Sequence, residues 1–272
     1  MRNAGRLIGA ASIALVLLAG CSSSSDKAGG GGTTTTVAPE PIKILVTNDD
    51  GYNADGIDAV VEGLKTIPNV EITVVAPATN QSGTGGNTTT GPLTVTDVTT
   101  KSGYKAKAVA GFPADTIIWA IDQKGIDFKP DLVISGINAG QNMGPVVDLS
   151  GTVGAARAAV ARGIPALAAS QGLGDPTNFA AGQKQVLAWL QSNMAAIEAG
   201  TMSTATVPNL NIPTCPTGDV RGQIDVPVAT SSDGYTDTPN CTSTATNPTD
   251  DIQAFLIGYA PLSQLSVKPA AG

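Results

Sequence analysis

The sequence predicts an α/β fold in which a mostly parallel β-sheet is covered by helices on both faces. Two observations support this class. From residue 42 onward, short runs rich in β-branched residues alternate with longer segments whose apolar residues recur at helical spacing. The strand-like runs are apolar almost throughout, which is typical of strands buried on both faces. The 272 residues, 42% of them hydrophobic, are enough for one sizeable core.

The expected strands and helices alternate along the chain. We expect strands at residues 42–48, 70–78, 130–138 and 164–170, and helices at residues 55–67, 112–123, 151–163 and 178–200. The first of these helices places its apolar residues on one face: Ile57, Val60, Val61 and Leu64. Gly163 is suited to end the third helix. Two further runs, at residues 92–100 and 104–111, alternate with a period near two and predict a β-hairpin.

The composition changes after about residue 205, where Thr, Pro, Asn and Gly dominate. Within this stretch only residues 224–229 and 252–265 have the apolar content of core elements. We therefore expect residues 42–205 to form the α/β core and residues 206–272 to form a loop-rich C-terminal extension. This extension would be an arm that packs on its own domain or on a neighbouring subunit, and we expect it to build a homo-oligomer interface.

The first 41 residues predict an export signal followed by a tether. Residues 1–21 have a basic start and a short apolar run that ends in Leu18-Ala19-Gly20-Cys21, which resembles a bacterial lipobox. We expect a lipoprotein signal peptide, lipidation of Cys21 and a lipid-anchored protein exported to the cell envelope. The alternative is a plain signal peptide with an incidental Cys. Residues 22–41, rich in Ser, Gly and Thr, predict a flexible linker.

The remaining two Cys residues are an even pair in a chain that we expect to be exported. Cys215 and Cys241 both lie in Pro- and Thr-rich sequence, where a disulfide is reasonable for that compartment. Two free thiols are the alternative. A metal site at these thiols is disfavoured, because the chain has no His and no further Cys to complete one.

The charge and the absent residue types exclude several classes of function. The formal net charge is −7 and the pI is near 4.5, so the chain is poorly suited to bind a nucleic-acid polymer. No His is present, which excludes a Ser-His-Asp triad, a His phosphoryl acceptor and a His-ligated zinc hydrolase. The Gly-rich run at residues 83–91 does not follow the first strand, which argues against a dinucleotide-dependent oxidoreductase.

Oxygen-bearing side chains follow three of the predicted strands. In an open parallel sheet ligands bind at the carboxyl ends of the strands, so these side chains should converge on one edge. Carboxylate, hydroxyl and amide oxygens are hard ligands, suited to Mg²⁺, Mn²⁺ or Ca²⁺ rather than Zn²⁺. A cation would also offset the repulsion between two adjacent carboxylates. The residues concerned are Asn48, Asp49, Asp50, Asn80, Ser82, Asn138 and Asn142.

The start of the helix at residues 151–163 is a candidate anion site. Ser150, Gly151 and Thr152 open this helix, whose unpaired N–H groups and positive dipole end favour a negative ligand. The alternative is that Ser150 merely caps the helix. Beside a cation at the same edge, phosphate binding is favoured. The combination predicts metal-assisted hydrolysis of a phosphate ester.

Seven motifs follow one another over most of residues 42–267: ILVTNDDGYNADGI, VVAPATNQSG, GFPADTIIWAI, PDLVISGINAGQNMG, SGTVGAARAAVARGIPALAAS, NLNIP and IQAFLIGYAPLSQL. In this order and combination the chain resembles the SurE family of survival-protein nucleotidases and phosphatases. The resemblance implies a Rossmann-like three-layer core, a β-hairpin extension and C-terminal arms exchanged in a homodimer or homotetramer.

The resemblance also implies an activity and a set of site residues. Family members hydrolyse nucleoside monophosphates, as 5′- or 3′-nucleotidases, with a divalent metal ion. Carried over residue by residue, the metal ligands fall on Asp49, Asp50, Ser82 and Asn138. The phosphate-contacting segment falls on Ser150, Gly151 and Thr152, with Asn80 and Gly83 close by. We expect one Mg²⁺ or Mn²⁺ ion per subunit, with Asp49 and Asp50 as the catalytic carboxylates.

Two functions of different classes remain open at this point. One is an exported, metal-dependent phosphomonoesterase that acts on nucleoside monophosphates or other small phosphate esters. The other is a non-catalytic surface lipoprotein that keeps the fold to bind a ligand or a partner. The complete oxygen set favours catalysis, because a protein that only binds need not keep all four residues.

Overall fold

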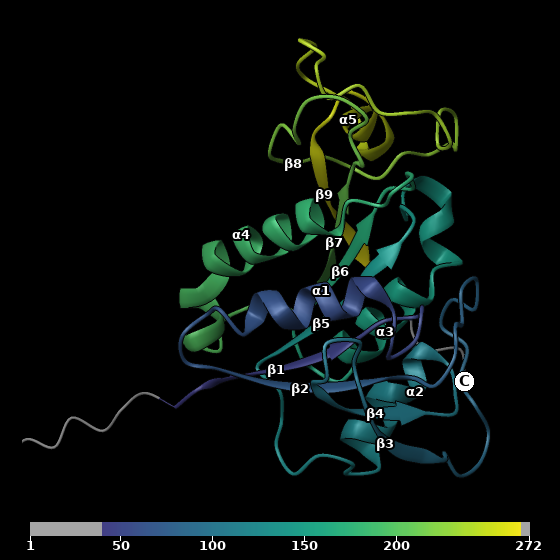
Figure 1. The fold of residues 1–272 in the computed structure, drawn as a ribbon, viewed down its shortest axis with the longest axis vertical. Helices are drawn as coiled ribbons and strands as arrows, with labels where there is room; N and C mark the ends of the chain where they lie inside the picture. Colours follow the sequence, from purple (N-terminus) through teal and green to yellow (C-terminus); the bar gives the residue numbers. More distant parts are fainter. Residues whose placement is uncertain (1–39, 268–272) are drawn as a thin grey trace, which may run out of the picture. The chain divides into compact units, whose positions relative to one another are not determined.

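The described residues of this computed structural model, 40–267, build one nine-stranded sheet with the order β3-β4-β2-β1-β5-β6-β7-β9-β8 (Figure 1). The strands are β1 Ile42–Thr47, β2 Val70–Pro77, β3 Val95–Thr99, β4 Lys105–Val109, β5 Leu132–Ala139, β6 Ala166–Gln171, β7 Thr206–Ile212, β8 Gln223–Asp225 and β9 Ala260–Ser266. The α-helices are α1 Asp55–Leu64, α2 Pro113–Ile117, α3 Gly151–Val160, α4 Phe179–Glu198 and α5 Asp251–Leu256. A π-helix, Ile118–Asp122, continues α2, and a 3₁₀-helix spans Gly144–Asp148.

The pairing of the strands confirms the mostly parallel α/β class. The neighbours from β4 through β2, β1, β5 and β6 to β7 all pair in parallel. β3 pairs antiparallel with β4, which confirms the predicted hairpin. At the other end β9 is antiparallel to β7. Because β1, β2 and β5 run the same way, their carboxyl ends open onto one edge of the sheet.

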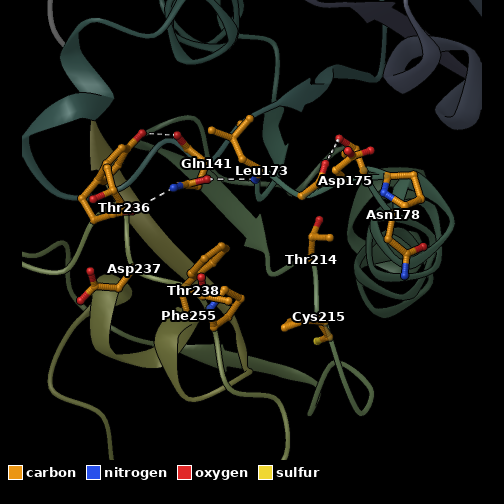
Figure 2. Close-up of a pocket in the computed structure, with 17 residues that line it drawn as sticks. Gln141, Leu173, Asp175, Asn178, Thr214, Cys215, Thr236, Asp237, Thr238 and Phe255 are labelled. Carbon is orange, nitrogen blue, oxygen red and sulfur yellow. Dashed lines mark hydrogen bonds between the residues drawn. The ribbon is translucent and has the colours of Figure 1, made fainter.

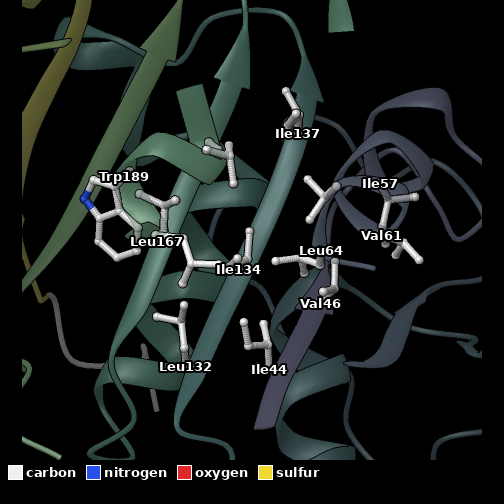
Figure 3. Close-up of a cluster of buried hydrophobic side chains, with 14 of the residues drawn as sticks. Ile44, Val46, Ile57, Val61, Leu64, Leu132, Ile134, Ile137, Leu167 and Trp189 are labelled. Carbon is white, nitrogen blue, oxygen red and sulfur yellow. The ribbon is translucent and has the colours of Figure 1, made fainter. Parts of the chain in front are cut away.

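Side chains on the two faces of the sheet build two separate cores. Ile44 and Val46 of β1 belong to one cluster with Ile57 of α1, and Trp189 of α4 joins this cluster beside Leu167 of β6 (Figure 3). Leu45, between them in sequence, packs in the cluster formed with α2 and α3. Successive strand residues point to opposite faces, so a strand covered on both faces must be apolar at each of these positions. This explains why the strands read as continuous apolar runs.

Two glycines allow α1 and β6 to approach the carboxyl end of β5 closely. A Cβ on Gly56 of α1 would lie 1.8 Å from the carbonyl oxygen of Ile137. Gly136 has a φ of +136°, and a Cβ there would lie 2.3 Å from the carbonyl oxygen of Ala169. A side chain at either position would push α1 or β6 away from β5. The close packing fixes the end of β5, which carries Asn138.

The C-terminal part of the chain corrects the core boundary expected at residue 205. β7 pairs with both β6 and β9, so residues 206–212 lie inside the sheet rather than in an extension. The composition was misleading because β7 carries two buried Asn residues. Asn209 and Asn211 are fully buried, and both donate hydrogen bonds to the carbonyl oxygen of Asn142. A strand with a polar composition therefore belongs to the core.

The apolar segment at residues 252–265 also packs on its own chain. Ile252 and Phe255 of α5 are each 2% exposed, and β9 pairs with β7. These side chains are already covered, so the segment does not supply the exposed apolar surface from which we expected a subunit interface. Association of subunits stays a prediction without that support.

A disulfide joins Cys215 to Cys241, with the Cα atoms 5.7 Å apart, which confirms the expected pair. It connects the loop after β7 to the stretch before α5. Within residues 40–267, no helix has the length and apolar character needed to cross a membrane. The predicted signal peptide, Cys21 and all but the last two residues of the predicted linker lie outside the described residues.

Removing the disulfide should destabilise the folded chain. The two Cys residues are separated by 26 positions. Closing a loop of that size restricts the unfolded chain enough to stabilise the fold by about 3 kcal/mol. Urea unfolding of the Cys215→Ser/Cys241→Ser variant should give a correspondingly lower free energy of unfolding. Reductant should lower the parent to the same value and leave the variant unchanged; a parent insensitive to reductant would contradict this role.

Candidate functional site

The two adjacent carboxylates lie directly after β1, in a turn that the sequence dictates locally. The side chain of Asn48 donates to the carbonyl oxygen of Gly51 at 2.9 Å and accepts from the Gly51 N–H at 3.2 Å. Gly51 has a φ of +104°, which an L side chain rarely adopts. Asp49 is 3% exposed and Asp50 is partly buried. Both are thus held at the sheet edge by the shape of the turn.

Each carboxylate accepts hydrogen bonds from a different neighbouring element. Asp49 Oδ1 accepts from the hydroxyl of Thr152, in α3, at 2.6 Å. Asp50 Oδ2 accepts from the backbone N–H of Ala139, at the end of β5, at 2.9 Å. Asp50 Oδ1 accepts from the side chain of Asn80, after β2, at 3.2 Å. The structure therefore brings the ends of β1, β2 and β5 together with the start of α3, as the sequence predicted.

The loop after β2 places Ser82 and Gly83 beside this network. The N–H of Gln81 donates to the backbone oxygen of Asp49 at 2.7 Å, and the N–H of Ser82 donates to Asn80 Oδ1 at 2.9 Å. The Ser82 hydroxyl is exposed and makes no hydrogen bond within residues 40–267. Gly83 has a φ of +77° and open space around its Cβ position. The loop is therefore tied to β1, and its hydroxyl is left available.

Asn138 contributes an oxygen that has no protein partner. Its side-chain nitrogen donates to the carbonyl oxygen of Gly140 at 2.7 Å, which fixes the orientation of the carboxamide. Its Oδ1 is buried and has no hydrogen bond among the described residues. A buried carbonyl without a partner costs about 1–3 kcal/mol, so such an atom in a native structure calls for an explanation. A cation at this edge would provide one.

The start of α3 serves both the helix and Asp49. The Ser150 side chain accepts from the N–H of Val153 at 3.1 Å, so the capping role considered from the sequence is confirmed. A Cβ on Gly151 would lie 2.8 Å from Asp49 Cβ and 2.9 Å from Pro113 Cγ. Only a glycine lets the helix start approach the carboxylate so closely. The positive end of the α3 dipole therefore faces the site.

Burial dominates the electrostatics of the two carboxylates. Burial raises the pKa of Asp49 from 3.8 to about 6, with a further increase from the charge of Asp50, although the hydrogen bond from Thr152 opposes it. Burial also raises the pKa of Asp50, against the hydrogen bonds from Ala139 and Asn80. No Lys or Arg of the described chain forms an ion pair with either carboxylate. The site therefore carries negative charge without a protein counter-charge.

The donor set fits a hard divalent cation. It offers two carboxylates, the unpartnered Asn138 oxygen and the free Ser82 hydroxyl, all of them oxygens. The described residues contain no cluster of three or more His, Cys, Asp or Glu side chains that could hold a metal. The amide and hydroxyl oxygens would therefore have to complete the coordination, which suits Mg²⁺ or Mn²⁺ better than Zn²⁺.

Besides Asn48, which holds the turn after β1, Asn142 of the predicted oxygen set also has a structural role. The N–H of Asn142 donates to Asn211 Oδ1 at 2.7 Å, and its side chain donates to the hydroxyl of Ser170 at 2.9 Å. These bonds join the end of β5 to β6 and β7. Asn142 is therefore used to fix the edge of the sheet and does not join the carboxylates.

Sequence reasoning missed the residue that holds the Gly-rich loop. Asp115 in α2 is 1% exposed and accepts from the N–H of Phe112 at 2.8 Å, which closes the first turn of that helix. It also accepts from the N–H and the hydroxyl of Thr89, the latter at 2.6 Å. The position of Asp115 in FPADT does indicate a helix-start role. Nothing in the sequence links it to Thr89, because that contact exists only in the fold.

The chain matches the sequence model of a single protein family over most of the described region. The match covers residues 44–233, and the family is described as survival protein SurE. This chain belongs to the SurE family. The resemblance carried by the seven motifs is therefore confirmed.

Relatives and a solved SurE structure extend this assignment. The 5′-nucleotidase SurE of Carboxydothermus hydrogenoformans is 39% identical over 186 residues, which are 66% of this chain and 68% of that protein. The 5′-nucleotidase SurE of Sulfurimonas denitrificans is 34% identical over 227 residues, 82% of this chain and 83% of that protein. The crystal structure of the SurE protein from Aquifex aeolicus has a TM-score of 0.65 at 26% identity, and the match covers 83% of this chain and 94% of that one.

The raised pKa of Asp49 predicts a loss of stability as the pH rises, in the absence of a divalent cation. Between the ordinary value of 3.8 and the folded value of about 6, the folded protein holds a proton that the unfolded chain has released. Its free energy of unfolding should therefore fall across this interval, by at most about 3 kcal/mol. Below the interval Asp49 is protonated in both states, and above it the loss is complete.

Chemical unfolding at a series of pH values, with chelator present, tests this prediction. Asp49→Asn is the matched variant, because Asn keeps the shape and can still accept from Thr152 but cannot ionise. The parent should lose more stability than the variant between pH about 4 and about 6. If the free energy of unfolding depends on pH in the same way in both proteins, the pKa of Asp49 is the same in the folded and the unfolded chain.

Proposed function

We propose that this SurE-family chain is a metal-dependent nucleotidase, a phosphomonoesterase that hydrolyses nucleoside monophosphates outside the cytoplasm. The observation that carries the proposal is the buried, unpartnered oxygen of Asn138, next to two carboxylates that lack a counter-charge among the described residues. Relatives named 5′-nucleotidase SurE support the same activity. A protein that only binds a partner has no need for this arrangement.

One divalent cation, Mg²⁺ or Mn²⁺, would be held by the oxygens of Asp49, Asp50, Ser82 and Asn138. When bound, it would supply the positive charge that offsets the two carboxylates and attracts the substrate phosphate. The protein fixes three of the four donors in advance: both Asp side chains are hydrogen-bonded, and Asn138 is oriented by Gly140. Ser82 completes the set from the loop after β2.

Asp49 is the residue that we assign to orient the attacking water or accept its proton. The chain has no His, so a carboxylate must take this role. Burial raises the pKa of Asp49 to about 6 in the absence of a cation, and a bound cation would lower it, so Asp49 would be ionised at neutral pH. The hydroxyl of Thr152 holds the side chain in one orientation. Asp49 can therefore act as a base without becoming the nucleophile.

The phosphate group of the substrate would lie at the start of α3. The backbone N–H groups from Ser150 to Thr152 lie at the positive end of this helix, where anions are favoured. Gly151 keeps the approach to Asp49 free of a side chain. Asn80 and Gly83 would border the same position from the loop after β2. The helix start would stabilise negative charge on the phosphate oxygens as the ester bond breaks.

The proposal includes a location at the cell envelope, with Cys21 lipidated and residues 22–41 as the tether. The disulfide supports an oxidising compartment, because disulfides persist outside the cytoplasm and are rare inside it. A homodimer or homotetramer is part of the proposal through the family resemblance alone. No nucleic-acid polymer is expected as a partner of this acidic chain.

Replacing Asp49 should remove activity while the fold survives. We expect Asp49→Asn to lower kcat for a nucleoside monophosphate by about 10²–10⁴-fold, the range that general acid–base groups contribute. Exhaustive chelation should abolish turnover in the parent, and Mg²⁺ or Mn²⁺ should restore it. Asp127→Asn, which removes an exposed carboxylate ahead of β5, should retain parental activity. Activity that survives both Asp49→Asn and chelation would refute the proposal.

The anchor is tested separately from the chemistry. In a bacterial host the full chain should fractionate with membranes, and Cys21→Ser should not. Labelling with a fatty acid should mark the parent and leave the variant unlabelled. Equal labelling of both proteins, or a parent found only in the soluble fraction, would contradict lipidation at Cys21 and leave the activity assay unaffected.

A further inference from the structure

A cavity of about 580 Å³ opens at the carboxyl ends of β5, β6 and β7. Four stretches of chain line it: residues 140–141 after β5, 173–178 after β6, 214–216 after β7, and 235–239 before α5, with Phe255 at its base (Figure 2). The volume falls in the range of small-molecule sites, about 300–1,000 Å³. Asp49 and Asp50 do not line the cavity. The link between the cavity and the candidate metal site is therefore made by the residues that lie between the two.

Gly140 joins the cavity to the candidate metal site. The side chain of Asn138 donates to the carbonyl oxygen of Gly140. A Cβ placed on Gly140 would lie 3.9 Å from the Asn138 amide nitrogen and 3.6 Å from a methyl carbon of Leu173. Asn138 and the cavity-lining Leu173 are therefore neighbours across one glycine. A substrate whose phosphate lies at the carboxylates has this cavity beside it for its other half.

Leu173 is a large apolar side chain that the fold leaves exposed to solvent. It is 67% exposed, and within residues 40–267 only Leu149 is a comparably exposed large hydrophobic residue. A single exposed Leu carries little meaning alone. This one lines a cavity next to an oxygen donor of the site. It offers an apolar surface on which the base or sugar of a nucleoside can pack.

The walls of the cavity are fixed to one another. The Gln141 side chain donates to the backbone oxygen of Tyr235 at 2.8 Å and accepts from the N–H of Leu173 at 3.2 Å. The Tyr235 hydroxyl donates to the backbone oxygen of Gln141. The disulfide holds Cys215, in the wall, to Cys241. A cavity built in this way needs little ordering when a ligand enters, which favours binding.

The charges of the lining restrict what can enter. The residues that line the cavity include the carboxylates of Asp175 and Asp237 and no Lys or Arg. Neither carboxylate has a hydrogen bond or ion pair within the described part of the chain. Two unpaired negative charges repel an anion and accept hydrogen bonds from hydroxyl groups. The lining therefore suits an uncharged, hydroxyl-bearing group.

We propose that this cavity binds the nucleoside half of the substrate, with Leu173 in contact with it, and that it rejects leaving groups that carry further phosphates. The proposal rests on the proposed nucleotidase function and adds the leaving-group site to it. The family match ends at residue 233, so the wall at residues 235–239 and Cys241 lie beyond it. Leu173 and Asp175 lie within the match, so the cavity would be formed by residues from both sides of its end.

The first test compares two substrates in the full chain with Mg²⁺ or Mn²⁺ present. Leu173→Ala should lower kcat/KM for nucleoside monophosphates about three- to tenfold, through a higher KM, because an apolar contact is lost. For glycerol 2-phosphate, whose leaving group is too small to fill the cavity, it should change kcat/KM less than about twofold. Equal losses for both substrates, or no loss for either, would overturn the role of Leu173.

The second test concerns charge. Asp175→Asn/Asp237→Asn should raise kcat/KM for nucleoside diphosphates relative to monophosphates by about two- to tenfold, and the gain should shrink at high ionic strength. Asp127→Asn removes an exposed carboxylate that lies ahead of β5 and does not line the cavity, and it should leave the ratio unchanged. If the double variant and the parent have the same ratio of kcat/KM for diphosphates to kcat/KM for monophosphates, Asp175 and Asp237 do not select against charged leaving groups.

Failure of the proposed function can be told apart from failure of this inference. A parent that hydrolyses neither ester, with metal present, refutes the nucleotidase. The cavity is then tested by the melting temperature of the full chain with the four common ribonucleosides at millimolar concentration. At least one nucleoside should raise the melting temperature of the parent and leave that of the Leu173→Ala variant unchanged. If none does in the parent, the cavity is not a nucleoside site.

Discussion

The removal from water of two adjacent carboxylates at the end of β1 is the constraint on which the rest of the site depends. Removing Asp49 from water costs more than its hydrogen bond from Thr152 returns, which is why its pKa rises to about 6. Asp50 shows the same imbalance with two hydrogen bonds. A chain under selection for stability alone would replace one of the two. Keeping both makes sense where a cation supplies the missing charge.

The hydrogen bonds that partly offset this cost of burial also assemble the site. Those of Asp50 come from the end of β5 and from the loop after β2, and that of Asp49 comes from α3. β1 lies between β2 and β5 in the sheet, so its end is the one place where all of these can meet. The order of the parallel strands, and the close packing that Gly56 and Gly136 allow, therefore decide where an oxygen-rich site can form.

The sequence predicts the sheet and its helices well because periodicity is a local signal. Ile44, Leu45 and Val46 are apolar on both faces of β1, and this alone indicates a buried parallel strand. β7 defeats the same reasoning, because its polarity comes from Asn209 and Asn211, whose partner lies about 70 positions earlier in the chain. Burial of a polar strand depends on a distant partner, which a single sequence does not reveal.

The same limit applies within the site. Asn138, at the end of β5, and Asn142, just after it, are equivalent oxygen donors in the sequence. The fold separates them, since Asn142 finds partners on β6 and β7 while the Asn138 oxygen finds none. The distinction between a structural and a ligating Asn therefore arises from what the surrounding strands leave unsatisfied. Residue type and position along the chain cannot supply it.

The disulfide links the stability of this chain to the proposed leaving-group cavity. The site built from β1, β2, β5 and α3 lies wholly within the family match, whereas the cavity is closed by residues beyond its end. Cys241, two residues beyond that wall, is joined to Cys215, which itself lines the cavity. One wall of the proposed leaving-group cavity thus contains a residue held by a disulfide, and disulfides persist in oxidising compartments, which supports the export that we propose.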